Sequence, residues 1–433
     1  MRARAAGVIA AIGFLGLVTN RHPLLPISCL ALGALIGVGP LDSLGWRLLG
    51  VWAYWIGSFL MSCESIRLLF STDFHRRDGQ IFFSLLPLLL FSWIRPDSRK
   101  TRIVLGIFWL AQAMIAAVSL GFDFSGHRTA LRGFTFYPDE GENTCNYCGL
   151  YLAHNAVGSV QALGVVVTAT LAVFSTGSRA RWFWGALSIP LLWGVILSQS
   201  RGSLIAMVIA LGVLVGIAIR QRAVSGRAVM RIGAVLVVTL VLFGSALIHR
   251  LGQFANESGT HTGRWEWWKR AMTEWTWSPI VGEGMGRYND HDREWSGLRY
   301  VYYVVTKATV VNDAWHAHNS YLHFLAEGGV VGLVLTAGLW VWAAWRLRSS
   351  RDPVRRAALL GILYLFAVSA TEHYMGGGAM LLVLSCLVGA AWNLPEPGGL
   401  TARSDPGSAS PPRIEAIANA TSTVGPPRPA PPA

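Results

Sequence analysis

Ionisable side chains gather at the mouth of one apolar stretch of this chain. The segment "HAHNSYLHFLAEGGVVGL", from His316 to Leu333, carries three histidines and Glu327 before it continues as ordinary membrane-helix sequence. Ionisable residues at the edge of a membrane segment are costly to desolvate and usually serve a function. Histidine, with an unperturbed pKa of about 6.5, is the natural general base near neutral pH. The pattern therefore indicates acid–base chemistry at this end of the segment.

A second chemical signal is Arg201, which follows Ser200 in "LSQSRGSLIAMVIAL" at the junction of two apolar stretches. One interpretation is an arginine whose guanidinium reaches out of the bilayer to the lipid headgroups. The alternative is an anion site, because the neighbouring serines and glycine form a polar, small-residue setting. The planar guanidinium suits bidentate binding of phosphate, and a helix that begins near Gly202 adds its N-terminal dipole. The flanking residues favour the anion site.

The elements that must position these residues are membrane helices. The chain has 433 residues, of which 53% are hydrophobic and 14% charged, whereas soluble domains carry roughly 25% charged residues. Apolar runs of spanning length recur throughout and predict an all-α polytopic membrane protein with about twelve transmembrane helices. The predicted spans lie near 5–20, 23–40, 44–62, 80–95, 103–121, 151–175, 182–198, 203–219, 232–248, 328–346, 357–375 and 377–393.

The basic residues predict the orientation of these spans. The net charge of +13 does not indicate nucleic-acid binding, because the arginines sit in short loops between spans. Four basic loops fall on the same side as the "MRAR" start, and we assign that side and the C-terminus to the cytoplasm; the loops are 95–102, 175–182, 220–231 and 346–356. The opposite side receives the segments 63–79, 122–150 and 249–327. Three arginines in 63–79 are an exception to the rule that Lys and Arg concentrate in cytoplasmic loops.

Three parts of the chain are expected to differ in character. We predict a transmembrane domain over 1–394, a large non-cytoplasmic loop over 249–327 within it, and a disordered Pro-rich cytoplasmic tail over 395–433. The N-terminus resembles a signal peptide without a small-x-small cleavage site, so we interpret it as a retained first helix. Cys145 and Cys148 form a CxxC pair that is either a local disulfide or two free thiols.

The large loop contains a predicted helix over 263–277, with Thr262 as its N-cap and tryptophans at three- and four-residue steps. This helix either lies in the lipid headgroup zone or packs on the protein's own outer surface. The glycines of "GEGMGRY" indicate unusual backbone angles or close approach to a ligand. Asp290, His291 and Asp292 follow and form either a metal site or a solvated acidic loop.

Several of these residues carry a resemblance to a known family. His318-Asn319, then nine residues, Gly329, two residues and Gly332 match the signature of the O-antigen ligase family. The "SRG" triplet at 200–202 before an apolar helix, and Arg264 in the tryptophan-rich helix, also match. The same signature is shared with O-antigen polymerases and bacterial protein O-oligosaccharyltransferases. The arrangement matches over most of residues 150–350.

The resemblance implies a GT-C-like fold and a glycosyltransferase of the bacterial inner membrane with its active site facing the periplasm. Such an enzyme takes a glycan from undecaprenyl diphosphate and transfers it to lipid A–core, with inversion and without a metal or another cofactor. The expected partners are this donor, this acceptor and membrane lipids, with no nucleic acid. The alternatives are an O-antigen polymerase, a protein O-oligosaccharyltransferase and, from a different class, a transporter of a lipid-linked glycan or an anion.

The resemblance also distributes roles among the residues. His318 is the expected base, and Arg201, Arg264 and Arg287 are expected to bind the diphosphate. Supporting roles fall to His316, as an alternative base or a partner of His318, and to Asn319 and Ser200. Glu327 is expected to make a helix-end contact, and Gly328 and Gly329 are expected to let the chain turn or pack tightly as it enters the bilayer.

Overall fold

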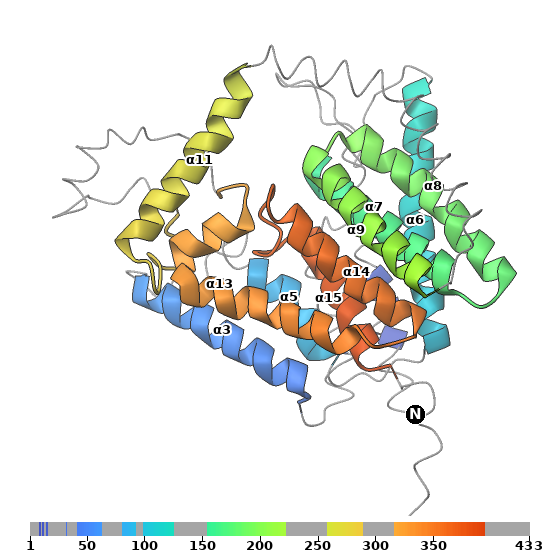
Figure 1. Ribbon diagram of the computed structural model, residues 1–433, viewed down its shortest axis with the longest axis horizontal. Coiled ribbons are helices and arrows are strands. Elements are labelled where there is room, and N and C mark those ends of the chain that lie inside the picture. The colour runs from blue at the N-terminus through green and yellow to red at the C-terminus, as the bar shows by residue number, and fades with distance from the viewer. Residues whose placement is uncertain are drawn as a thin grey trace, which may run out of the picture. The chain divides into compact units, whose positions relative to one another are not determined.

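The computed structural model describes residues 41–62, 80–91, 98–124, 154–221, 258–288 and 316–394, with a few isolated positions before residue 33. All regular secondary structure in these ranges is helical (Figure 1). The helices are α3 (Ser43–Ser62), α5 (Gln80–Leu90), α6 (Ser98–Phe124), α7 (His154–Phe174), α8 (Ser178–Ser198), α9 (Arg201–Arg220), α11 (Ser258–Trp277), α13 (Ser320–Leu347), α14 (Pro353–Val368) and α15 (Ala379–Trp392).

The protein is a multi-pass membrane protein by the length and apolar character of its helices. Five helices among the described residues are long and apolar enough to cross a bilayer, and these are α6, α7, α8, α9 and α13. Helices occupy the predicted spans from 44–62 to 203–219 and from 328–346 to 377–393. The predicted spans 23–40 and 232–248 lie almost wholly outside the described residues, as do the Cys145–Cys148 pair, Asp290 to Asp292 and the tail.

One predicted span is placed too far along the chain. The span expected over 357–375 corresponds to α14, which ends at Val368. The following residues form a loop up to Gly378, where α15 begins after a glycine with φ of +98°. The predicted span ran past the end of the helix because the apolar Tyr374 and Met375, both buried, follow the polar residues of this loop.

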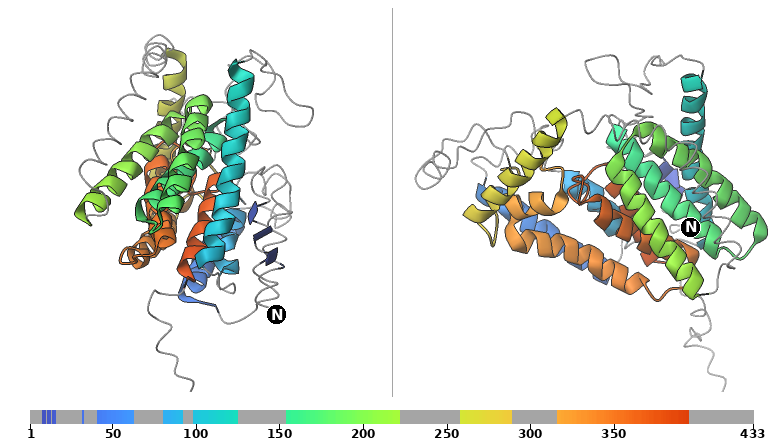
Figure 2. Two further views of the ribbon diagram at one scale, coloured as in Figure 1. Left: turned by 90° about the vertical axis from the view of Figure 1, so that its right-hand side faces the viewer. Right: turned by 45° about the horizontal axis from the view of Figure 1, so that its top comes forward.

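Helix α7 lies at the centre of one helix group and is buried along most of its length (Figure 2). It packs against α8, α9, α14 and α15. Small residues allow this close approach, because a Cβ added at Gly158 would lie 2.4 Å from Ser198 Oγ, and one at Gly164 would lie 2.7 Å from the Trp109 ring. Glycines on α7 therefore let neighbouring helices pack tightly.

Helix α13 is broken at Gly329, where φ is +59° and ψ is −165°. The segment 279–284 lies against the break and supplies the backbone partners that the helix loses there. Such compensation is required wherever helical backbone is interrupted at membrane depth. The N–H groups of Val330 and Val331 donate to the carbonyls of Pro279 and Ile280, while those of Glu283 and Gly284 donate to Ala326 and Glu327.

Helix α3 packs behind the same break. The Tyr54 hydroxyl donates to the Gly328 carbonyl at 2.6 Å, and Trp55 Nε1 donates to Thr336 Oγ1 at 2.9 Å. A Cβ added at Gly328 would lie 2.5 Å from the Trp55 ring, and one at Gly332 would lie 3.2 Å from it. The prediction that Gly328 and Gly329 allow a turn and tight packing is confirmed by these contacts.

Helix α11 confirms the predicted tryptophan-rich helix but begins earlier than expected. It starts at Ser258, so Thr262 lies inside the helix and is not its N-cap. The helix packs beside α13 (Figure 2). Within the helix, Arg270 and Glu274 form an ion pair, with Nε and Oε1 2.8 Å apart. Trp265 is 57% exposed on the opposite side. The helix therefore has one face against the protein and one face directed outward.

Candidate active site

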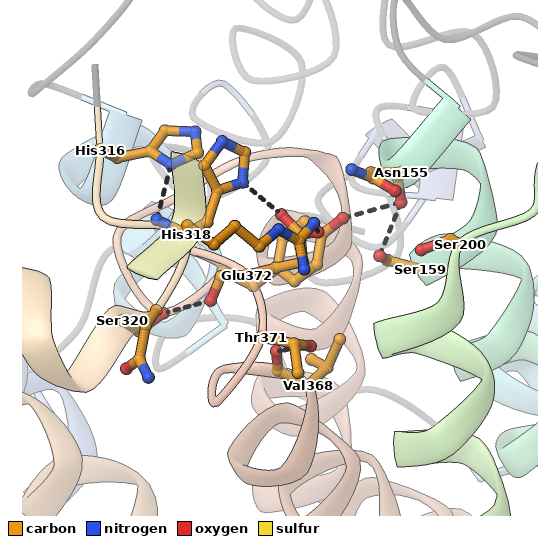
Figure 3. A network of polar contacts seen from close by, with 12 residues as sticks. Asn155, Ser159, Ser200, His316, His318, Ser320, Val368, Thr371 and Glu372 are labelled. Atoms are coloured by element: carbon orange, nitrogen blue, oxygen red, sulfur yellow. Dashed lines mark hydrogen bonds and ion pairs between the residues drawn. The ribbon is translucent and has the colours of Figure 1, made fainter. Parts of the chain in front are cut away.

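The Glu372 carboxylate joins two residues that the sequence singled out. His318 Nδ1 lies 3.0 Å from Glu372 Oε2, and Arg264 Nη2 donates to Glu372 Oε1 at 3.1 Å (Figure 3). The Glu372 side chain is 7% exposed, whereas those of His318 and Arg264 are 25% and 43% exposed. One buried carboxylate thus holds an imidazole and a guanidinium that both remain accessible.

His318 stands in an unusual backbone conformation at the entrance to α13. Its φ of +47° lies in the left-handed region, which non-glycine residues seldom adopt and which often marks functional sites. Its N–H donates to His316 Nδ1, and its ring stacks on Trp267 with the centroids 4.8 Å apart. The Glu372 contact directs the Nδ1 proton to the carboxylate and leaves Nε2 as the basic nitrogen.

Asn319 and Ser320 fix the chain directly after His318. The Asn319 carboxamide oxygen caps α13 by accepting from the N–H groups of Tyr321 and Leu322, and its amide donates to the Ala370 carbonyl. The Ser320 hydroxyl donates to the Glu372 carbonyl. These contacts tie the start of α13 to the loop after α14. The expected supporting residue Asn319 therefore acts on the backbone around His318.

The start of α9, which carries Arg201, meets the same loop. Gly202 packs so closely that an added Cβ would lie 2.1 Å from Thr371 Oγ1 and 3.8 Å from Glu372 Cγ. Arg201 itself is exposed. The structure thus brings the backbone that carries Arg201 to the end of the helix group where His318, Arg264 and Glu372 meet.

Ser200 belongs to a buried chain of hydroxyl groups. Ser200 Oγ lies 2.8 Å from Ser203 Oγ, which lies 2.8 Å from Ser159 Oγ on α7 (Figure 3 labels Ser200 and Ser159). Ser200 is 2% exposed. Its hydroxyl therefore holds the first turn of α9 against α7, and its support of Arg201 is indirect.

Arg287 lies on a loop that reaches the His318 region, because the hydroxyl of the adjacent Tyr288 donates to the carbonyl of Trp267, whose ring stacks on His318. It is in the glycine loop 282–288, where Glu327 Oε1 accepts from the N–H groups of Gly286 and Tyr288. The loop attaches to the break in α13, and these hydrogen bonds confirm the expected helix-end contact of Glu327.

Glu372 itself was missed in the sequence. It stood inside the predicted span 357–375, and an acidic residue within an apolar span is by default a candidate functional residue. That signal was present in "SATEHYMGGG" and would have identified both the carboxylate and the adjacent His373. Within the described ranges, no group of three or more His, Cys, Asp or Glu side chains is arranged to hold a metal ion.

Three further histidines lie near the base, of which His323 is buried and His316 and His373 are half-buried. Burial, followed by the charges of His318, His323 and Arg264, lowers the pKa of His316 to about 3. Burial also lowers the pKa of His373, whose ring centroid lies 3.9 Å from that of His323. His316 is therefore neutral near pH 7, and its Nδ1 stays available as the acceptor for the His318 N–H.

We expect acidification to destabilise this region. An unfolded chain protonates His316 near the ordinary pKa of 6.5 but the folded chain only near 3, so this stability is complete above 6.5 and is lost as the pH falls towards 3. Thermal unfolding in detergent at about pH 7 and about pH 5 measures the loss. His316→Asn places an amide oxygen at the Nδ1 position without a titrating group and should reduce the loss. An equal loss in the variant would contradict this explanation.

Comparison with known proteins places three of the site residues in one family region. Residues 186–337, which include Arg201, Arg264 and His318, match a family model described as O-antigen ligase. The chain is also 27% identical over 279 residues to the exopolysaccharide production protein ExoQ of Rhizobium meliloti (strain 1021), and the match spans 60% of each chain. The expected resemblance to the O-antigen ligase family is confirmed by this match over residues 186–337.

Proposed function

We propose that the protein is an O-antigen ligase that transfers a glycan from undecaprenyl diphosphate to lipid A–core. The family suggests a polysaccharide-assembly glycosyltransferase with lipid-linked glycan substrates. The observation that carries the proposal is the convergence of His318 and Arg264 on one buried carboxylate at the ends of apolar helices. In this proposal the chain crosses the inner membrane about twelve times in a GT-C-like arrangement, and this end faces the periplasm.

The proposed reaction is a direct inverting displacement. His318 Nε2 removes the proton from an acceptor sugar hydroxyl as the hydroxyl oxygen attacks the anomeric carbon of the donor. The bond between that carbon and the diphosphate oxygen breaks, and undecaprenyl diphosphate leaves with the bonding electrons. No metal takes part in the proposed step, because fixed guanidinium groups stabilise the negative charge that develops on the leaving group.

The arginines differ in their suitability for this role. Arg264 donates to Glu372 through Nη2, and its half-exposed guanidinium carries further N–H groups that can bind phosphate oxygens. Arg201 stands at the N-terminus of α9, where the helix dipole also favours an anion. Arg287 lies beside Tyr288 in the loop at the break in α13, and we assign it an auxiliary contact with the diphosphate.

Replacing Arg201 or Arg264 with lysine should weaken donor use by roughly 10-fold or more. Lysine keeps the charge but loses the planar fork that binds a diphosphate bidentately. Initial rates of glycan transfer at varied donor concentration measure the effect. Arg348→Lys is a matched control, because Arg348 lies over the Trp345 ring at the other end of α13. Near-normal turnover of Arg201→Lys would instead support an arginine that only reaches the headgroups.

Deletion of the gene tests the ligase assignment against the strongest alternative. A ligase null strain leaves free lipid A–core and accumulates the carrier-linked long glycan on a lipopolysaccharide gel. A polymerase null strain leaves lipid A–core that carries a single repeat. The polymerase is the second candidate, because the relative from Rhizobium meliloti is named for exopolysaccharide production. Loss of glycosylated proteins with normal lipopolysaccharide would instead indicate a protein O-oligosaccharyltransferase.

A further inference from the structure

We propose that Glu372 is a positioning residue that sets the tautomer of His318 and holds Arg264 in place through its two separate oxygens. This inference rests on the proposed function, because it assigns His318 as base and Arg264 as a diphosphate ligand. Glu372 does not touch the substrates in this scheme. It acts through the two residues that do.

Glu372 can perform both tasks because each of its two carboxylate oxygens contacts a different residue. Oε2 faces His318 Nδ1 at 3.0 Å, and Oε1 receives the Arg264 Nη2 donor at 3.1 Å. With Nδ1–H donating to a carboxylate, the lone pair of the neutral ring lies on Nε2. The same carboxylate stabilises the imidazolium that forms once Nε2 has taken the acceptor proton.

The backbone of Glu372 is held independently of its side chain. Its N–H donates to the Val368 carbonyl, and its own carbonyl accepts from the Ser320 hydroxyl. The loop therefore has anchors that survive a change of the carboxylate. Glu327 provides a contrast, because its Oε1 accepts from two backbone N–H groups of the glycine loop and so fixes the backbone directly.

Glutamine at position 372 separates the two tasks. An amide has one acceptor oxygen and one donor NH₂, and Arg264 can only donate, so the amide oxygen must face Arg264. The NH₂ group then faces His318 Nδ1, which has to accept a hydrogen bond. The ring proton moves to Nε2, and the basic nitrogen points away from the acceptor hydroxyl. Glu372→Gln should thus keep the Arg264 contact but remove the base.

The test measures kcat and the donor KM separately for the full-length enzyme in detergent. We expect Glu372→Gln to lower kcat by roughly 10²–10⁴-fold and to change the donor KM by less than about 3-fold. Glu372→Ala loses both contacts, so it should lower kcat and also raise the donor KM. Glu372→Asp retains an acidic partner and should recover part of kcat. Glu266→Gln, which alters an exposed carboxylate paired with Lys269 on α11, should leave both constants unchanged.

Three results would overturn the inference. Near-normal kcat in Glu372→Gln would show that the tautomer does not depend on this carboxylate. Equal kcat and KM in the Gln and Asp variants would indicate that only local packing matters. Unchanged donor KM in Glu372→Ala would remove the link to Arg264. Absence of glycan transfer by the wild-type enzyme would instead contradict the proposed function. In that case the Arg264 contact is still tested by comparing how much undecaprenyl diphosphate raises the melting temperature of the wild type and of Glu372→Ala.

Discussion

Replacing His318 with alanine should lower glycan transfer by roughly 10²–10⁴-fold. The variant lacks the only group assigned to take the acceptor proton, while the Arg264 and Glu372 contact and the α13 cap remain. Donor KM should therefore change little. Rates with purified enzyme and complementation of a deletion strain both measure the effect. Complementation at the wild-type level would remove His318 from the proposed mechanism.

The backbone of His318 provides a way to separate activity from stability. Because its φ of +47° is strained for residues with a Cβ, His318→Gly should relieve the strain by about 1 kcal/mol or slightly more. The glycine variant should be as inactive as His318→Ala but should unfold at a higher temperature than His318→Ala. An inactive variant with higher thermal stability than the alanine variant would show that the lost function does not come from misfolding.

Replacing Gly329 with alanine should have the largest effect on folding. At φ of +59°, a Cβ there would lie 2.3 Å from both the carbonyl carbon and the oxygen of Ile280. These are backbone atoms of the segment that closes the break in α13, so they cannot move aside as a flexible side chain would. Strain in the left-handed region costs about 1–3 kcal/mol, and displacing the segment also removes hydrogen bonds at membrane depth. We expect a lower yield of folded protein and a lower melting temperature.

Gly338→Ala is the matched control on the same helix. Nothing lies within 4 Å of a Cβ added at Gly338, and alanine is a better helix former than glycine by roughly 0.5–1 kcal/mol. This variant should fold as well as the wild type or better. Gly282→Ala, whose added Cβ would lie 2.2 Å from the Glu327 carbonyl carbon, should behave like Gly329→Ala. Normal folding of Gly329→Ala would show that the segment can shift without loss.

Local signals in the sequence located much of the site. The apolar runs predicted the helices, and the His318-Asn319 pair with its glycines predicted where a polar loop enters α13. Asn319 caps the helix, so its role follows from short-range chemistry that a sequence pattern contains. Arg264 was singled out through the family resemblance, because it lies in the helix with a clear tryptophan period.

What the sequence did not reveal depends on contacts between distant segments. Glu372 is 54 positions from His318 and 108 from Arg264, and nothing local pairs them. The predicted span 357–375 ran through the polar residues of the loop that carries Glu372, so the end of the helix was placed beyond Val368. Arg287 is a further example, because no sequence pattern indicates which residues a basic side chain in a glycine loop will contact.

The break in α13 constrains the order in which the protein can be assembled. The half-helix before Gly329 exposes carbonyl groups that hydrocarbon cannot solvate, and their partners come from 279–284 and from Tyr54 on α3. Helix α3, the segment 279–284 and helix α13 must therefore dock together before all of these carbonyl groups have hydrogen-bond partners. Folding around the break is therefore a single cooperative event. A chain that begins at residue 41 keeps α3, whereas a chain that begins at residue 63 lacks it, and the second should be degraded much faster by membrane proteases.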